Sequence, residues 1–176
     1  SVLWLFIYFA SPARADVYIV IYATHNGKTG HCGIAVDHYK VVVQDERIGG
    51  NINYRLDSVK TGTLTYYDLW PVNDSYKGNY EGDVEARYYK LPSDRWKQWI
   101  SLRTLSDQGV PHKFGYPCDG LISFPCSKRE DFEMVAYLDN RLRQQKAFNA
   151  MHHNCCDFVS DAITYLTDRE IVAKEF

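Results

Sequence analysis

The stretch His153-Asn154-Cys155-Cys156-Asp157-Phe158-Val159 organises this chain. From Cys155 onward, apolar residues recur at the spacing of a half-buried helix, namely Phe158, Val159, Ala162, Ile163 and Leu166. Asn154 is a good N-cap, so the helix is predicted to begin at Cys155. The helix dipole and the free N–H groups at such a start favour a thiolate. The pattern therefore predicts a nucleophile at Cys155 or, as for most free cysteines, a small buried apolar residue.

Length and charge limit the class of protein. The chain has 176 residues, which fits one domain with a sizeable core. Its formal net charge is −2 and no cluster of Lys or Arg is present, which argues against nucleic acid as a partner. No repeat, linker or low-complexity tract divides the sequence, so we expect a single domain over residues 16–176 and a monomer.

The N-terminal residues are apolar from Val2 to Ala10 and continue into the small-x-small sequence Ala13-Arg14-Ala15. This pattern is typical of a secretory signal peptide, and the run is shorter than the ~20 residues that a spanning helix needs. We therefore expect residues 1–15 to be a signal peptide and the mature protein to begin at Asp16. The expected location is periplasmic or extracellular, without stable membrane insertion. A first core strand or a docked helix is the alternative.

Five cysteines are an odd number for a protein of an oxidising compartment, so at least one lacks an intramolecular disulfide partner. Cys118 and Cys126 flank a short segment and could pair, although spacing alone does not establish the bond. An unpaired thiol is also what a cysteine enzyme requires.

The order of the predicted elements gives the fold class. Strands come first, at residues 17–23, 59–70 and 84–91 and in a hairpin of 31–36 and 41–45 with a turn at 37–40. Helices follow at residues 93–105, 130–146 and from 155, whereas 46–58 and 108–129 are predicted to be irregular. Strands followed by helices indicate an α+β fold, with an antiparallel sheet packed against the C-terminal helix.

The first strand of the hairpin carries the candidate base, His31. Strand side chains alternate, so His31 shares a face with Gly33 and Ala35, whose small size would let a helix pack closely. A turn that pairs residues 36 and 41 puts Gln44 on the same face, and a slip of one residue puts Asp45 there instead. Either side chain could orient His31 toward a thiol. A core-edge histidine bonded to a backbone carbonyl is the alternative.

Two short motifs in this chain resemble a known superfamily. Gly-His-Cys-Gly-Ile-Ala-Val at residues 30–36 resembles the His-x-Gly-Ile strand of NlpC-type cell-wall endopeptidases. Asn-Cys-Cys-Asp-Phe-Val at residues 154–159 resembles the Asn-Cys-x-x-Phe-Val helix of circularly permuted members, the lecithin retinol acyltransferase-like and YiiX-like proteins. Histidine precedes cysteine here, as in the permuted group. The resemblance implies a papain-type fold with Cys155 as nucleophile, His31 as base and Gln44 as the best match for a polar third residue.

One departure concerns the residues after the nucleophile, where Cys156-Asp157 replaces those usual in the acyltransferase branch. The expected function is a secreted cysteine hydrolase that cleaves an amide through a thioacyl intermediate, without cofactor or metal. Its expected substrate is a peptide or amide such as a peptidoglycan fragment. The Cys155 backbone N–H would supply part of an oxyanion hole, with Tyr18 or Tyr22 as a second donor.

Two alternatives remain beside this hydrolase. One is a thiol acyltransferase or esterase acting on lipid acyl groups. The other is a non-catalytic ligand- or metal-binding domain, with zinc ligands drawn from His31, Cys32, His152, His153, Cys155 and Cys156. Their spacing matches no standard zinc pattern, because adjacent helix residues point about 100° apart.

Overall fold

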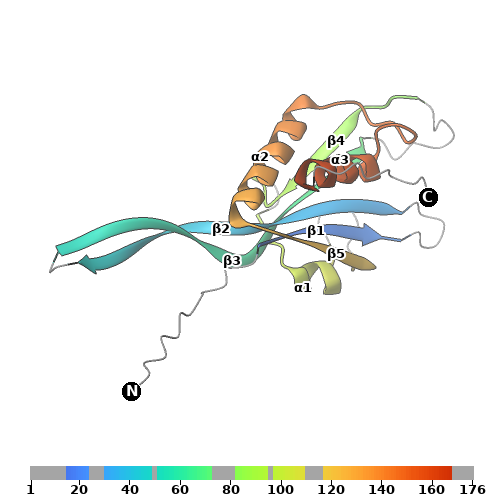
Figure 1. Ribbon diagram of the computed structural model, residues 1–176. Coiled ribbons are helices and arrows are strands. Elements are labelled where there is room, and N and C mark those ends of the chain that lie inside the picture. Colours follow the sequence, from blue (N-terminus) through green and yellow to red (C-terminus); the bar gives the residue numbers. More distant parts are fainter. Residues whose placement is uncertain are drawn as a thin grey trace, which may run out of the picture.

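The computed structural model describes residues 15–23, 30–48, 51–72, 82–94, 97–109 and 117–167. The predicted signal peptide lies outside these residues apart from Ala15. The elements in chain order are β1 (Ala15–Tyr22), β2 (His31–Ile48), β3 (Asn51–Pro71), β4 (Ala86–Leu91), α1 (Leu102–Asp107), β5 (Gly120–Cys126), α2 (Lys128–Gln144) and α3 (Cys155–Thr167). The sheet has the order β4-β3-β2-β1-β5, and every neighbouring pair is antiparallel (Figure 1). The predicted α+β class, with an antiparallel sheet and a C-terminal helix, is confirmed.

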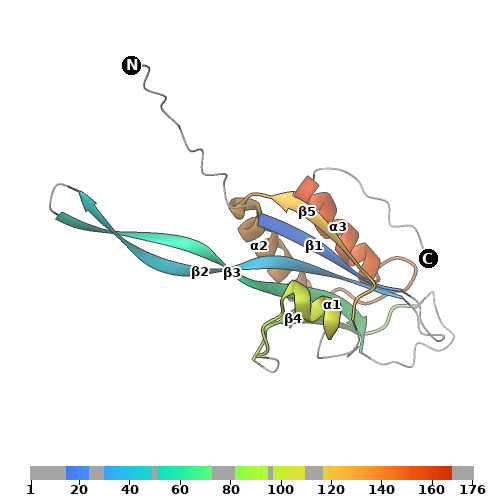
Figure 2. The same ribbon diagram turned by 90° about the horizontal axis from the view of Figure 1, so that it is seen from below.

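The helices lie on both faces of the sheet. Figures 1 and 2 show α2 and α3 on one face and α1 on the other. The first core cluster fills the space between the sheet and the helices α2 and α3, with Cys32 at its margin. It includes Ile34, Val36, Tyr67, Leu69, Met134, Leu138, Phe158, Val159, Ala162 and Ile163. The α1 face is covered by the second cluster, which includes Tyr18, Val20, Tyr22, Ala35, Leu64, Tyr66, Leu91, Ile100 and Leu105. Alternate residues of β2 therefore face different helices: Cys32, Ile34 and Val36 face α2 and α3, whereas Ala35 faces α1.

The two long helices begin where their capping residues place them. Ser127 caps α2, because its hydroxyl accepts from the Glu130 N–H and the Glu130 carboxylate accepts from the Ser127 N–H. The α2 helix matches the predicted helix 130–146 within two residues at each end. The strand predicted at residues 17–23 corresponds to β1. Local patterning was sufficient for these elements.

The predicted hairpin turn at residues 37–40 is wrong. Strand β2 continues through this segment to Ile48, with only an irregularity in its pairing with β3 between Asp37 and Tyr39. Residues 46–58, predicted to be loop, instead belong to the ends of β2 and β3. Together they form an arm, residues 41–48 and 51–58, that extends beyond the body of the molecule (Figure 1).

One face of this arm is apolar and exposed. Val43 of β2 pairs with Leu56 of β3, and their exposed fractions are 60% and 71%. Tyr54 lies on the same face and is 71% exposed. These side chains take no part in the two core clusters, so the apolar face of the arm does not contribute to the core.

Two further predictions from sequence are corrected, and the open question of a disulfide between Cys118 and Cys126 is answered. The helix expected at residues 93–105 is replaced by the short α1, capped by Ser101, whose hydroxyl accepts from the Thr104 N–H. The segment 108–129 contains the regular strand β5, paired along its length with β1. A Cys118–Cys126 disulfide does not form, and both thiols are free. The extended β5 separates the two cysteines by roughly 20 Å, whereas a disulfide needs Cα atoms within about 7 Å.

Candidate active site

The start of α3 is fixed by a reciprocal cap. The Asn154 Oδ1 accepts from the N–H groups of Cys156 and Asp157, at 2.7 and 3.1 Å. The Asp157 carboxylate accepts in return from the Asn154 N–H at 2.9 Å. The predicted N-cap is confirmed, and the cap uses the Cys156 N–H but not that of Cys155. The Cys155 N–H is among the first-turn donors that no intrahelical carbonyl can reach.

Three sulfur atoms meet between α3 and β2. The Sγ atoms of Cys32, Cys155 and Cys156 all lie within 4.8 Å of one another, and we call them the thiol cluster. Cys32 reaches it because it shares the α3-facing side of β2 with Ile34 and Val36. Both cysteines of the first helical turn direct their sulfurs toward Cys32.

The thiol cluster titrates as a unit. Hydrogen bonds from the thiols of Cys155 and Cys32, followed by the charge of His31, lower the pKa of Cys156. The Cys155 thiol donates hydrogen bonds to Cys156 and to Cys32, and these bonds together with burial raise the pKa of Cys155 well above its usual value. The bond from Cys155 lowers the pKa of Cys32, but the bond to Cys156 and burial together outweigh it and raise that pKa to about 12. The pKa is lowered at Cys156 and raised at Cys155, the reverse of what the helix start alone predicted.

On the opposite face of the sheet, His31 pairs with Asp68. The His31 Nε2 lies 3.2 Å from the Asp68 Oδ2, and the two residues are 3% and 0% exposed. The same oxygen accepts from the Tyr66 hydroxyl at 3.1 Å and from the Trp70 Nε1–H at 3.2 Å. The imidazole stacks on Trp70 with ring centroids 4.1 Å apart. Asp68 therefore fixes the position of His31 through one ring nitrogen, as an orienting carboxylate does in a catalytic triad.

Strand alternation accounts for this arrangement. Tyr66, Asp68 and Trp70 occupy every second position of β3 and so share one face, which is also the face of His31. Gly33 stands between them on β2, and a Cβ at this position would overlap the Tyr66 ring. The small residue beside His31 thus makes room for a tyrosine of the neighbouring strand. The expectation that it makes room for a helix is wrong, since α3 packs on the other face.

Sequence reasoning missed Asp68. A signal for it exists: Tyr66-Tyr67-Asp68-Leu69-Trp70 places a lone carboxylate in an aromatic strand, where a charge must find partners. Gln44, predicted as the third residue, instead pairs with Arg55 in the exposed arm, and Asp45 pairs with Tyr54. Gln44 lies on the same strand as His31, thirteen residues away, so it cannot contact the imidazole. The predicted register failed because β2 does not turn at residues 37–40.

The other candidate residues have separate places. His153 lies with its Nε2 3.0 Å from the Tyr88 hydroxyl, and His152 is exposed, so neither belongs to the thiol cluster. Tyr18, named as a second oxyanion donor, donates to the Asp16 carboxylate. Tyr22 packs near His31, with ring centroids 6.0 Å apart, on the face opposite α3. Of the six possible zinc ligands, the structure brings together Cys32, Cys155 and Cys156.

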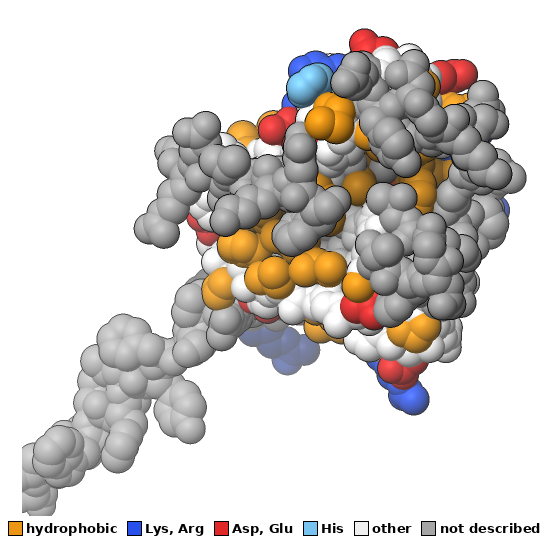
Figure 3. Space-filling view, turned by 90° about the vertical axis from the view of Figure 1, so that its right-hand side faces the viewer, with side chains coloured by type: hydrophobic (Ala, Val, Ile, Leu, Met, Phe, Trp, Pro, Cys, Tyr) orange, Lys and Arg blue, Asp and Glu red, His pale blue; other side chains and the backbone are white. Residues whose placement is uncertain are grey.

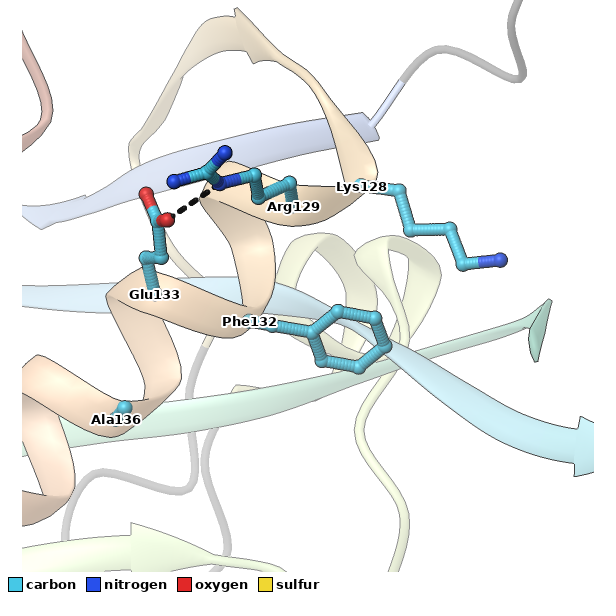
Figure 4. A pocket seen from close by; sticks show the side chains of 5 residues that line it. All are labelled: Lys128, Arg129, Phe132, Glu133 and Ala136. Atoms are coloured by element: carbon cyan, nitrogen blue, oxygen red, sulfur yellow. Dashed lines mark hydrogen bonds and ion pairs between the residues drawn. The ribbon is translucent and has the colours of Figure 1, made fainter. Parts of the chain in front are cut away.

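One surface hollow lies on α2, away from these residues. A shallow hollow of about 540 Å³ is lined by Lys128, Arg129, Phe132, Glu133 and Ala136, all on the outer face of α2 (Figure 4). None of these residues belongs to the thiol cluster or to the His31–Asp68 pair, so we assign it no role in the chemistry. The end of the molecule where β1 ends and β2 begins shows hydrophobic side chains gathered on its surface (Figure 3). The site residues His31 and Cys32 belong to this end of β2.

No protein-family model matches the chain, and no match was found among curated proteins or solved structures. The superfamily named from the two motifs therefore stays a prediction. None of the helices in the described part of the chain combines the length and apolar character that a membrane crossing requires.

Proposed function

We propose that this protein is a cysteine hydrolase of the papain type that cleaves an amide bond in a peptide, such as a fragment of the cell wall. The observation that carries the proposal is the buried His31–Asp68 pair at the start of β2, next in the chain to Cys32, whose sulfur lies with those of Cys155 and Cys156 at a capped helix start. A thiolate, a histidine and an orienting carboxylate are the parts of nucleophilic catalysis by cysteine.

The backbone N–H groups of Cys155 and Cys156 differ in their partners, and this difference distinguishes the roles of the two cysteines. Asn154 already occupies the Cys156 N–H, whereas the cap leaves the Cys155 N–H to a developing oxyanion. We therefore assign the nucleophilic attack to Cys155 and the resting negative charge to Cys156. A proton shift along the Cys155–Cys156 hydrogen bond puts the charge on Cys155.

The reaction then has two steps. Because His31 is the first residue of β2, the scheme places the substrate at that end of the sheet, between the imidazole and the thiol cluster. The Cys155 sulfur bonds to the carbonyl carbon of the amide, the C–N bond breaks, and the amine leaves with a proton from His31. A water molecule gives its proton to His31 and attacks the thioester, which releases the acid and restores the thiol cluster. Asp68 acts only as a positioning residue for His31 in this scheme.

Incubation with peptidoglycan fragments and with acyl lipids, followed by mass spectrometry of products and protein, tests this function. We expect cleaved peptide and an acyl adduct on Cys155 that disappears in Cys155→Ser. Cys118→Ser is the matched control, because Cys118 is free and lies outside the thiol cluster, and it should keep full turnover. Turnover that persists in Cys155→Ser would refute the assignment. Acyl transfer from lipid without peptide cleavage would favour the acyltransferase instead.

Export is part of the same proposal. The Asp16 N–H donates to the Asp37 carboxylate at 2.9 Å. Cleavage after Ala15 would turn this N–H into an ammonium beside that carboxylate, which is a favourable ion pair at a strand start. N-terminal sequencing of the protein from a secreting host should find Asp16, whereas a folded soluble product that retains residues 1–15 would overturn the export.

A further inference from the structure

Cys32 takes no covalent part in the proposed hydrolysis, yet its sulfur lies with those of Cys155 and Cys156. The three ligand atoms come from two elements that are far apart in sequence and are held together by the packing of α3 on β2. Cys32 extends from a central strand, and the other two belong to a helical turn fixed by the Asn154 cap. The arrangement is therefore built by the fold and not by local sequence.

We propose that the thiol cluster is a binding site for a thiophilic d¹⁰ cation, with Zn²⁺ as its borderline member. Thiolate is the ligand that Zn²⁺, Cd²⁺ and Cu⁺ prefer in proteins. Sulfur atoms around tetrahedral zinc, each bonded at about 2.3 Å, lie about 3.8 Å apart. The sulfurs here lie within 4.8 Å of one another, so side-chain rotations that move each by less than about 1 Å close the site.

The ligand set leaves the fourth zinc position open. His31 is held by Asp68 through Nε2 and does not belong to the group of three, so it does not supply this ligand. Among the described residues, no other His, Cys, Asp or Glu joins the group of three. Three protein ligands with an open position resemble catalytic rather than structural zinc sites, in which the fourth position takes water or substrate.

Metal and acyl chemistry would compete for the same sulfurs, since Cys155 is both ligand and proposed nucleophile. Zn²⁺ should therefore inhibit the hydrolase, and a chelator should restore it. The binding itself does not depend on the proposed function, because it is measured on the protein without substrate.

The test is titration of the reduced, metal-free full chain with Co²⁺ and then Zn²⁺, without oxygen. We expect one equivalent of Co²⁺ to give an intense sulfur-to-cobalt charge-transfer band that one equivalent of Zn²⁺ abolishes. Cys32→Ser should weaken Zn²⁺ binding by more than the roughly 10- to 100-fold that loss of an outer-shell partner costs. Cys118→Ser and Cys126→Ser are the matched controls and should bind as the unaltered protein does, because both thiols lie outside the thiol cluster.

Two results would overturn the site. One is an affinity of Cys32→Ser equal to that of the unaltered protein, and the other is loss of binding in Cys118→Ser. Cys32→Ala, which suits the apolar margin at which Cys32 lies, repeats the test if the serine variant does not fold as judged by circular dichroism. If no substrate is ever cleaved but the cobalt band appears, the hydrolase fails and the metal site stands. If peptide is cleaved but no cobalt band appears, the metal site fails and the hydrolase stands.

Discussion

The Nε2 of His31 and the Oδ2 of Asp68 lie 3.2 Å apart in the interior, although the residues are 37 positions apart in the chain. Two strands carry them to the same face of the sheet, and Asp68 receives further hydrogen bonds from Tyr66 and Trp70. The first prediction follows from this contact. Asp68→Asn should lower turnover by roughly 100- to 10,000-fold, because the imidazole loses its orienting carboxylate.

The matched control for Asp68 is Gln44→Ala, which should leave turnover unchanged, since Gln44 lies in the arm. Nitrogen NMR of His31 separates positioning from folding, because a merely structural role would not alter the imidazole tautomer. Reduced turnover in Gln44→Ala with full activity in Asp68→Asn would exclude the assignment.

The second prediction concerns the acidity of the thiols. Below pH 7 iodoacetamide should label Cys156 fastest, because hydrogen bonds from Cys155 and Cys32 lower its pKa. Cys126 should stay unlabelled at this pH, since burial and the nearby Asp131 raise its pKa. His31→Ala should move labelling to higher pH, because the variant lacks a positive charge that favours the thiolate. Peptide mapping by mass spectrometry identifies the labelled residue, and fast labelling of Cys126 would contradict this order.

The third prediction tests the close contact of Gly33 with Tyr66. Gly33→Ala should reduce the free energy of unfolding by about 1 to 3 kcal/mol, because the new methyl group displaces the Tyr66 ring. Gly120→Ala is the control, since its Cβ would lie 3.8 Å from the nearest atom of Ile21, an ordinary contact. Urea unfolding measures both variants. Equal losses would mean that the Tyr66 ring yields freely and does not constrain β2.

The fourth prediction is a pH dependence that comes from Asp131. Burial raises the pKa of this carboxyl to about 6, despite opposing hydrogen bonds from Cys126 and Tyr39. A raised pKa means stability that is full below the unfolded value of ~3.9 and is lost as pH rises through about 6. The stability of Asp131→Asn relative to the unaltered protein should therefore rise by about 2 to 3 kcal/mol between pH 4 and pH 6, as roughly two pKa units require.

The neighbouring Glu130 provides a control of opposite sign. Hydrogen bonds from the N–H and hydroxyl of Ser127 lower its pKa, so the stability that it contributes is lost as pH falls below ~4.3. Glu130→Gln should thus differ from the unaltered protein mainly above that pH. Denaturant unfolding across pH gives both difference curves, and identical curves for the two variants would disprove the role of burial at Asp131.

The fifth prediction concerns the arm. Replacing residues 43–56 with Asn-Gly should leave the free energy of unfolding within about 1 kcal/mol of its original value, since the described residues of this stretch, 43–48 and 51–56, lie outside both core clusters. The pair Val42–Asp57 would flank the new turn, for which Asn-Gly is suited. Tyr39→Phe is the comparison outside the arm. It removes a hydrogen bond to buried Asp131 and should reduce the free energy of unfolding by about 1 kcal/mol. Loss of cooperative thermal unfolding in the shortened chain would show that the arm supports the domain.

The sequence by itself determined those elements whose signals are local. The Asn154 cap and the apolar period after Cys155 placed α3 correctly, because capping and amphipathic spacing act within a few residues. The apolar run of β1 was equally clear. These signals sufficed for the α+β class and for a thiol at a helix start.

Only the tertiary structure decided which side chains meet. Whether β2 turns at Asp37 or continues depends on its partner strand β3, which begins beyond residue 50. The register of these two strands places Asp68, and not Gln44, beside His31. Because side chains alternate along β2, His31 lies on the α1 face and Cys32 on the α3 face. On the α3 face, Cys155 and Cys156 complete the thiol cluster. The face on which α3 packs therefore decided that Cys32, and not His31, lies with the two helix cysteines.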